Sequence, residues 1–269
     1  MASQNSEVVG PQKSFVMEMR ARREAVGLSR NKLAETLGCT PQWLSKVENY
    51  DKTPSEGLAD DLDTYWKTGG TFRRLWEQMV EARKQGLVPS AFRPLIDAER
   101  EAVQINIYEP LLIPGIFQSA EYARRVLSTG FHQENLEELL AIRMERQKLY
   151  EKADPPAVFL VIREAVIRDL PLEVRIDQCK KLLDLISWPR VFIQVIPSST
   201  HVFEPTGFQI LSFAGAADVA YVEGANGHGQ MFVQAEEVRG LDVLFNVIRA
   251  AALPVEETEH LIHTIMEGT

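Results

Sequence analysis

The stretch TPQWLSKVENYDKTP, residues 40–54, contains an amide and an amine, Gln42 and Lys46, that lie four residues apart. Thr40 has a side chain suited to a helix N-cap, and Pro41 suits the first helical position, so a helix is predicted to begin here. Residues four apart share one helix face, so Gln42 and Lys46 are predicted to be presented together. Amide and ammonium groups form hydrogen bonds with base edges, which makes this face a candidate nucleic-acid-binding surface.

The charge around this stretch differs in sign from that of the whole chain. The 269 residues carry a formal net charge of −9. Between Lys13 and Lys52 there are eight Lys or Arg and five Asp or Glu, a local net charge of +3 that leaves −12 for the remainder. Attraction to phosphate acts over roughly one Debye length, about 8–10 Å, so the local charge matters more than the total.

The sequence also contains a base and a carboxylate that could form a catalytic site. His228 in ANGHGQ follows Glu223, so a base and a carboxylate could meet there, although a glycine-rich hairpin explains the segment better. No Ser-His-Asp order, GxxxxGK or HExxH spacing is present, and the histidines form no cluster beyond the pair His260 and His263. We therefore expect neither an enzyme nor a metal site or cofactor.

The elements that would position Gln42 and Lys46 are short capped helices. A first helix is predicted from Ser14 to near Gly27, after a polar and mobile arm at 1–12. Ser29 caps a second helix that Gly38 ends, and Thr40 caps the third. Two further helices are predicted from Ser55 to about Tyr65 and over 71–86.

Beyond residue 155 the pattern changes to short β-branched and aromatic runs. Strands are predicted at 158–163, 191–197, 208–213 and 219–224, with helices at 173–187, 235–252 and 255–267. Earlier, helices are predicted near 95–104, 118–128 and 134–151, and INIYEPLLIPGIF reads as extended chain with turns. The fold class is therefore α+β: an N-terminal all-α helix-turn-helix bundle with its connecting helix at 13–88 and a mixed α+β domain at 89–269.

Composition limits the cellular setting. No run approaches the roughly 20 apolar residues that span a bilayer, and the polar start lacks the apolar core of a signal peptide. Cys39 and Cys179 lie 140 residues apart with no CxxC pattern, so reduced and mostly buried thiols are expected. We expect a cytoplasmic protein, associated with the nucleoid if it binds DNA, and no membrane partner.

The stretch GLSRNKLAETLGCTPQWLSKVEN resembles the lambda-repressor-like, or XRE-type, DNA-binding domain. Such domains typically read L-S-Q-x-x-L-A-x-x-x-G-V-S-x-x-x-I-S-x-x-E-N-G. The residues that match are Leu28, Ser29, Leu33, Ala34, Gly38, Thr40, Ser45, Glu48 and Asn49. Arg30 stands where the family often has a phosphate-contacting glutamine, and Tyr50 replaces the usual glycine after the asparagine.

The resemblance implies a role for each residue of the third helix. That helix would lie in the major groove, where Gln42 reads adenine and Lys46 reads guanine, while Arg30 and Thr40 hold the backbone. Trp43 either presses on sugar or a thymine methyl or packs on a neighbouring helix. The full set of expected DNA-binding residues is Ser29, Arg30, Thr40, Pro41, Gln42, Trp43, Ser45, Lys46 and Asn49. A local charge of +3 is modest, so a homodimer on a pseudo-palindromic double-stranded operator is expected.

The later segment EPLLIPGIFQSAEYARRVL resembles a signature of actinobacterial regulators of the WhiJ-like type, E-P-L-x-[VI]-P-G-x-x-Q-[ST]-x-x-Y-[AT]. The resemblance covers about residues 95–255. It implies a regulator of development or antibiotic production, paired with a small partner protein encoded nearby. The expected partner-binding or ligand-binding residues are Glu109, Pro110, Pro114, Gly115, Gln118 and Tyr122.

Two alternatives remain open from the residues alone. The rigid segment 109–115 has apolar side chains that need a surface, so it either clamps the two domains together or lines a partner groove or ligand pocket. The whole protein is predicted to be a transcriptional regulator whose C-terminal domain dimerises and receives a signal. The alternatives are an interaction module in which DNA binding is secondary and a regulator that senses a small ligand.

Overall fold

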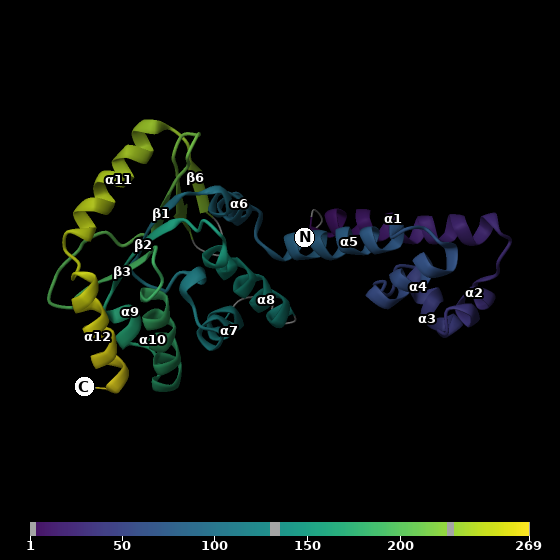
Figure 1. Ribbon diagram of the computed structural model, residues 1–269, viewed down its shortest axis with the longest axis horizontal. Coiled ribbons are helices and arrows are strands. Elements are labelled where there is room, and N and C mark those ends of the chain that lie inside the picture. The colour runs from purple at the N-terminus through teal and green to yellow at the C-terminus, as the bar shows by residue number, and fades with distance from the viewer. Residues whose placement is uncertain (1–3, 130–134, 225–228, 269) are drawn as a thin grey trace. The chain divides into compact units, whose positions relative to one another are not determined.

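A computed structural model describes residues 4–129, 135–224 and 229–268, which fold as two compact units, Met1–Leu87 and Val88–Thr269 (Figure 1). The first unit is helical. The second combines a six-stranded sheet with helices, so the predicted α+β class is confirmed. None of the helices in the described part of the chain is both long enough and apolar enough to cross a membrane.

The N-terminal unit consists of five helices around one apolar core. They are α1 (Gln4–Ala25), α2 (Arg30–Thr36), α3 (Pro41–Glu48), α4 (Glu56–Trp66) and α5 (Thr71–Leu87). α1 packs along α5, α4 also contacts α5, and α2 contacts α3. Phe15, Leu33 and Leu44 are among the fully buried side chains of this core.

α1 begins earlier than the sequence predicts. It starts at Gln4, so most of the segment expected to be an arm is helical, and Pro11 lies inside the helix. Phe15 and Met19 are buried in the core and anchor the helix. Each residue added to an existing helix gains one backbone hydrogen bond, so the helix can extend into the polar sequence before Phe15.

The short helices begin and end at the predicted residues. The Ser29 hydroxyl accepts from the Lys32 N–H, and the Thr40 hydroxyl accepts from the Trp43 N–H at 3.2 Å. Gly38 has a φ of 64°, which is the left-handed conformation that ends α2. Tyr50 has a φ of 66°, so it adopts the left-handed conformation that glycine adopts most readily, despite having a side chain.

The second unit follows with a longer series of elements. Up to the second strand these are η1 (Ser90–Phe92), α6 (Arg93–Glu101), β1 (Gln104–Glu109), η2 (Gly115–Phe117), α7 (Ala120–Ser128), α8 (Leu136–Arg146), η4 (Gln147–Glu151) and β2 (Ala157–Arg163). The remainder are α9 (Ala165–Arg168), α10 (Leu172–Ile186), β3 (Val191–Ile196), β4 (Phe208–Ser212), β5 (Val219–Glu223), β6 (Gly229–Phe232), α11 (Ala235–Arg249) and α12 (Val255–Glu267).

The sheet has the strand order β3-β2-β1-β4-β5-β6. β1, β2 and β3 are parallel, whereas β4, β5 and β6 each run antiparallel to the preceding neighbour. β1 therefore joins the parallel half to the antiparallel half, with Tyr108 opposite Val161 on one side and Phe208 on the other.

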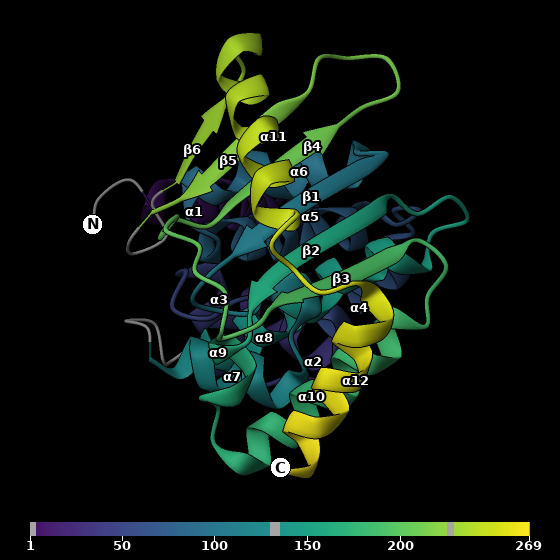
Figure 2. The ribbon, with the colours of Figure 1, turned by 90° about the vertical axis from the view of Figure 1, so that its left-hand side faces the viewer.

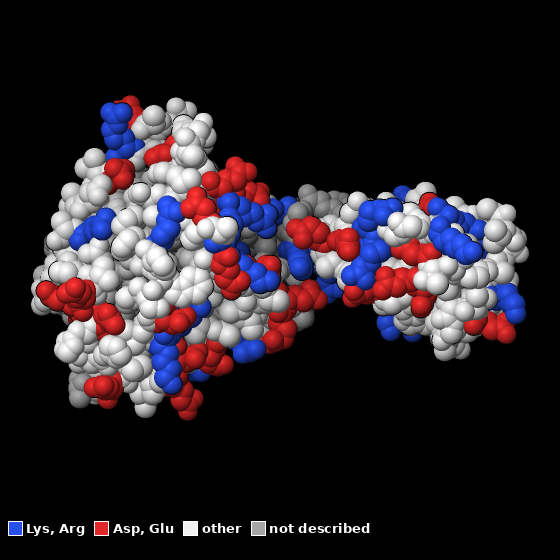
Figure 3. Space-filling view, viewed as in Figure 1, with Lys and Arg blue, Asp and Glu red and all other residues white. Residues whose placement is uncertain are grey.

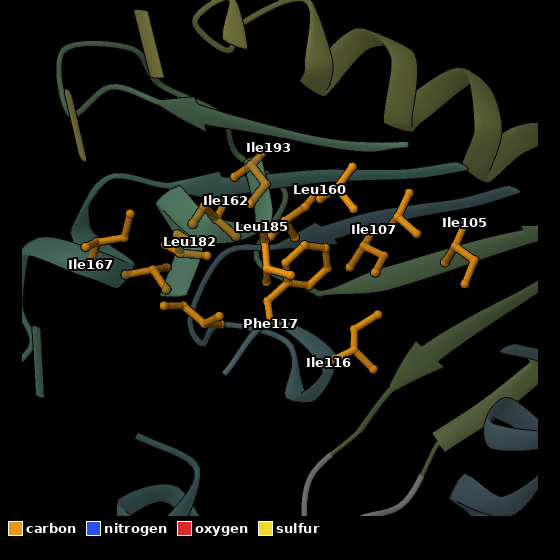
Figure 4. Close-up of a cluster of buried hydrophobic side chains, with 14 of the residues drawn as sticks. Ile105, Ile107, Ile116, Phe117, Leu160, Ile162, Ile167, Leu182, Leu185 and Ile193 are labelled. Atoms are coloured by element: carbon orange, nitrogen blue, oxygen red, sulfur yellow. The ribbon is translucent and has the colours of Figure 1, made fainter. Parts of the chain in front are cut away.

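Helices cover both faces of the sheet. α11 contacts β1, β4 and β5 on one face (Figure 2). On that face Phe245 and Ile248 belong to the same buried cluster as Tyr108 and Ile210. On the other face, aliphatic side chains from β1, β2 and β3 point toward Phe117 of η2 and Leu182 of α10 (Figure 4). The sheet is thus buried on both sides along most of β1 and β2.

The strand predictions hold for four strands and miss two. β2, β3, β4 and β5 lie at the predicted positions, to within one or two residues. β1 lies where the sequence predicts the end of a helix followed by extended chain with turns. The strand is missed because its partners lie about 50 and 100 residues away, and pairing with them decides its conformation. β6 is a four-residue edge strand whose sequence, GQMF, carries little strand character.

The turn from α4 to α5 depends on one carboxylate, and its removal is testable. Asp63 accepts from the Thr68 hydroxyl and from the backbone N–H groups of Phe72 (3.0 Å) and Arg73 (2.8 Å) at the start of α5. Burial acts to raise the pKa of Asp63, but these hydrogen bonds outweigh it and hold the pKa below its ordinary value.

Asp63→Asn is expected to destabilise the N-terminal unit by about 2 kcal/mol at neutral pH, since a charged acceptor for two helix N–H groups is lost. Because the folded-state pKa is depressed, this contribution is present above the unfolded-state pKa and is lost as the pH falls through the lower folded-state pKa. Hydrogen exchange of the α4 and α5 amides measures this loss of stability. Equal protection in the two proteins at neutral pH would contradict the assignment.

Candidate functional site

The two side chains expected to read bases lie exposed on α3. Gln42 and Lys46 are both exposed, and Thr40 is an exposed N-cap at the start of the same helix. Trp43 is partly buried and packs against the core of the N-terminal unit, so packing is its observed contact. The face that α3 presents to solvent therefore combines an amide, an amine and a helix N-terminus.

Arg30 and Ser45, which are also expected to contact DNA, are hydrogen-bonded to each other. Arg30 Nη1 donates to Ser45 Oγ at 3.0 Å, and Arg30 Nε donates to Glu48 Oε2 at 2.7 Å. The Arg30 side chain nevertheless remains 39% exposed. It therefore couples α2 to α3 while part of its guanidinium stays in solvent.

Glu48 is the residue that joins these helices, and sequence reasoning gave it no role. Its side chain is fully buried, at 0% exposed. Arg23 Nε lies 3.1 Å from Oε1, and Arg20 Nε lies 3.9 Å from Oε2 while the same guanidinium donates to the Glu48 carbonyl oxygen. Three arginines from α1 and α2 thus share one carboxylate on α3.

This network leaves positive charge near α3. Arg23 has a second partner, the exposed Glu24 carboxylate at 3.3 Å, and the Arg20 guanidinium lies 5.8 Å from the centroid of the Tyr50 ring. On the face of the N-terminal unit drawn in Figure 3, Lys and Arg gather in several groups with Asp and Glu between them. The positive charge on that face is therefore divided and does not form one continuous patch.

The remaining residues of the expected DNA-binding set form helix ends. Ser29 is exposed and caps α2, Pro41 is exposed at the first position of α3, and Asn49 is exposed at the C-cap of α3. All of them lie on or beside the α2–α3 pair. The structure thus brings the expected set together on two helices and the turn between them.

In the second unit, the EPLLIPG segment leaves the end of β1 and packs on α7 and α8. Pro110 and Pro114 are buried, and the Tyr122 hydroxyl accepts from the Ile113 N–H at 3.3 Å. Gln118 Nε2 donates to the Ile113 carbonyl at 2.6 Å. Most of the signature residues therefore hold the segment to its own unit.

Arg143 and Arg146 of α8 approach the backbone of η2. Arg143 Nη1 donates to Gln118 Oε1 at 2.9 Å. A side chain at Gly115 would meet Arg146 Nη1 at 3.4 Å and Arg143 Nε at 3.5 Å, so glycine permits this close approach. Arg146 pairs with buried Glu99 at 2.8 Å, which leaves Arg143 the less neutralised of the two.

Glu109, the first residue of the signature, lies in an unusual electrostatic environment. Burial, and to a lesser degree the charge of Glu223, raises its pKa to about 8. Desolvation also raises the pKa of Glu223, against the opposing charges of Arg143 and Arg146. Burial lowers the pKa of Arg143 to about 10, and the nearby charge of Arg146 adds to this. Charged groups thus converge at the end of β1, whereas His228, the other candidate base, lies outside the described residues.

Comparison with known families identifies the larger unit. Residues 92–264, well over half of the chain, match the family model described as a domain of unknown function (DUF5753). The chain belongs to the DUF5753 family. Residues 14–76 match a helix-turn-helix domain, which covers α2, α3 and the network around Glu48.

Other comparisons add little to the DUF5753 assignment. No curated protein matches the chain. A solved structure of TrmBL2, an archaeal chromatin protein described as showing a novel mode of DNA binding, superposes with a TM-score of 0.33 at 11% identity. The match covers 85% of this chain and 88% of that chain, but a superposition this loose supports no inference.

The arginine network is testable through its acceptor. Glu48→Gln is expected to destabilise the helix-turn-helix unit by roughly 3 kcal/mol, because three guanidinium groups lose their shared buried charge. Urea unfolding followed by tryptophan fluorescence measures this, since Trp43, Trp66 and Trp76 all lie in that unit. Glu24→Gln is the matched control, because it removes an exposed partner of Arg23 and is expected to cost less than about 1 kcal/mol. Equal effects of the two substitutions would contradict the central role of Glu48.

The raised pKa of Glu109 makes the stability of the DUF5753 unit depend on pH. The folded state holds a proton on Glu109 between the ordinary value of 4.5 and about 8, whereas the unfolded state does not. The contribution of this bound proton to folding stability is therefore fully present below pH 4.5 and is lost as the pH rises through about 8. Glu109→Gln stays neutral throughout, so its melting temperature is expected to rise relative to the parent protein over this range and then to level off.

Thermal unfolding at several pH values measures that difference. Glu257→Gln, which removes an exposed carboxylate from α12 of the same unit, is the matched control. A difference for Glu109→Gln that stays constant across this pH range would show that the pKa of Glu109 is not raised in the folded protein.

Proposed function

We propose that this protein is a sequence-specific DNA-binding regulator of transcription in which α3 is the recognition helix. The observation that carries the proposal is the exposure of Gln42 and Lys46 one turn apart on a helix that Thr40 caps. A helix-turn-helix domain places the N-terminal part of its second helix against base edges in the major groove. Gln42 has the amide suited to adenine, and Lys46 has the amine suited to guanine.

The arginines around Glu48 supply the phosphate contacts in this proposal. The side chains of Arg20 and Arg30 are 35% and 39% exposed, and both pair with the fully buried Glu48 of α3. Phosphate contacts fix the register of the helix without reading sequence. Attraction to phosphate acts over about 8–10 Å, so the charge beside α3 matters more for binding than the net charge of the whole chain.

We further propose that the protein binds as a homodimer and that the DUF5753 unit receives a signal. A single unit with a divided positive surface makes few phosphate contacts, and two copies on a pseudo-palindromic operator double them. The sequence signature suggests the WhiJ-like type, with a small partner protein encoded nearby. In this proposal the C-terminal unit regulates and does not catalyse, and the protein acts at the nucleoid in the cytoplasm.

A second candidate, an interaction module in which partner capture is the main activity, has one observation in its favour. Leu111 is 75% exposed and Leu112 is also exposed, directly after Glu109 in the signature. Two adjacent exposed leucines on a segment fixed by prolines provide an apolar contact for a protein partner. Loss of partner binding on Leu111→Ser with DNA binding intact would separate the two activities.

The DNA-binding proposal is tested with duplexes selected from a random library by the full-length protein. Lys46→Ala is expected to weaken binding about tenfold in a gel-shift titration, and Gln42→Ala to relax the preference at one base position. Lys84→Ala, which removes an exposed lysine from α5, is the matched control and is expected to change neither. Unchanged affinity and base preference in both α3 variants would rule out this helix as the reader.

A further inference from the structure

β6 is the last strand on its side of the sheet in the DUF5753 unit (Figure 2). Its inner edge pairs antiparallel with β5 from Gly229 to Phe232. Among the residues that the structure describes, the backbone of 229–233 has no hydrogen-bond partner other than β5. Alternate residues of a strand direct their N–H and C=O groups to opposite edges, so part of this backbone faces outward without a partner.

The opposite edge of the sheet, at β3, is covered by the start of α12 and the chain before it. The Leu253 N–H donates to the Val195 carbonyl at 2.9 Å, and the Thr258 hydroxyl accepts from the Val195 N–H at 3.0 Å. Gln194 Nε2 donates to the Leu253 carbonyl at 2.9 Å. The fold thus covers one edge of the sheet and leaves the other available for pairing.

The open edge lacks the features that prevent further strand pairing. Edge strands are commonly protected by lysine, proline, a bulge or a covering segment. The sequence GQMFVQ, residues 229–234, contains no charged residue and no proline. β6 pairs with β5 in continuous register without a bulge, and Gln234 still has extended backbone angles, with φ −77° and ψ 123°. Another strand could therefore add along the whole of 229–234.

The absence of charge in this segment favours a second copy of the same segment as the added strand. In a two-fold interface, residue i of one copy contacts residue j of the other, and j contacts i. In an antiparallel strand pair, the residue on the axis is therefore opposite its own copy. A charge near the axis would face the same charge, which destabilises a cross-strand pair. A segment without charges can pair with itself without this repulsion.

Met231 is the residue that best fits the axis. With Met231 opposite its own copy, Gly229 of one copy is opposite Val233 of the other. Val233 is 62% exposed and shares a strand face with Met231, which is opposite Tyr221 of β5. Gly229 has no side chain, and the tip of the Tyr221 side chain occupies the space that a Cβ there would need. Val233 of one copy would therefore pack beside Tyr221 of the other and become covered.

We propose that β6 pairs antiparallel with β6 of a second copy about a two-fold axis at Met231, so that the sheets of two DUF5753 units join into one. This proposal rests on the homodimer proposed above and names the surface through which it forms. One short strand pair buries an area at the low end for protein interfaces, so the dimer is weak in solution. Binding of two copies to one operator strengthens it, because the second contact is then intramolecular.

The test is sedimentation velocity of the full-length protein without DNA over a wide range of protein concentration. The parent protein is expected to change from monomer to dimer as the concentration rises. Gln230→Lys and Gln230→Glu are each expected to weaken the dimer about fivefold, because the two Gln230 side chains are diagonal neighbours across the axis, roughly 7–8 Å apart. An equimolar mixture of the two variants is expected to associate at least as strongly as the parent protein, since opposite charges then meet.

Control variants separate pairing at β6 from effects on folding. The Gln230 side chain is exposed, so neither substitution is expected to change the melting temperature. Ser199→Lys and Ser199→Glu add the same charges at an exposed residue after β3 and are expected to leave self-association unchanged. Val233→Ser is expected to weaken the dimer several-fold, because it removes the apolar contact with Tyr221 of the other copy.

Three results would overturn the proposal: a protein that stays monomeric at every concentration, a dimer that both charge variants leave intact, or a mixture of the variants that associates no better than either alone. The first result would leave the edge for a strand of a different protein. The second would exclude this interface and keep the homodimer. Because the samples contain no DNA, none of these results bears on base reading by α3, and failure of the gel-shift test leaves the pairing of β6 standing.

Discussion

The buried carboxylate of Glu48 is the constraint on which the helix-turn-helix unit depends. An ionised side chain with no solvent exposure is tolerated only when charged donors surround it, and here Arg20, Arg23 and Arg30 reach it from α1 and α2. The same contacts fix α3 against both helices. A chain with a net charge of −9 thereby keeps cationic groups beside its candidate recognition helix, since their number exceeds what Glu48 neutralises.

Local chemistry in the sequence predicts the N-terminal helices well. Ser29, Gly38 and Thr40 mark helix ends through side-chain caps and a left-handed turn, which are effects of a few neighbouring residues. Tyr50 shows that a residue with a side chain can adopt the left-handed conformation after α3. β1 could not be predicted in the same way, because its conformation comes from pairing with β2 and β4, which lie far along the chain.

Some features of the candidate sites likewise follow from local sequence, and others depend on contacts between distant parts of the chain. The exposure of Gln42 and Lys46 follows from helical periodicity, so the sequence predicts it. The pairing of Arg30 with Ser45 and Glu48 depends on how α2 packs on α3, which the spacing of residues does not specify. The approach of Glu109 to Glu223 could not be predicted from the sequence, because the two residues are 114 positions apart and meet only through the register of three strands.

The network around Glu48 carries more positive than negative charge. In it, three guanidinium groups share one buried carboxylate. This imbalance does not favour folding, because like charges held close together repel and desolvation adds to the cost. A bound polyanion would relieve the imbalance. Under the DNA-binding proposal, the helix-turn-helix unit is therefore more stable when bound than when free.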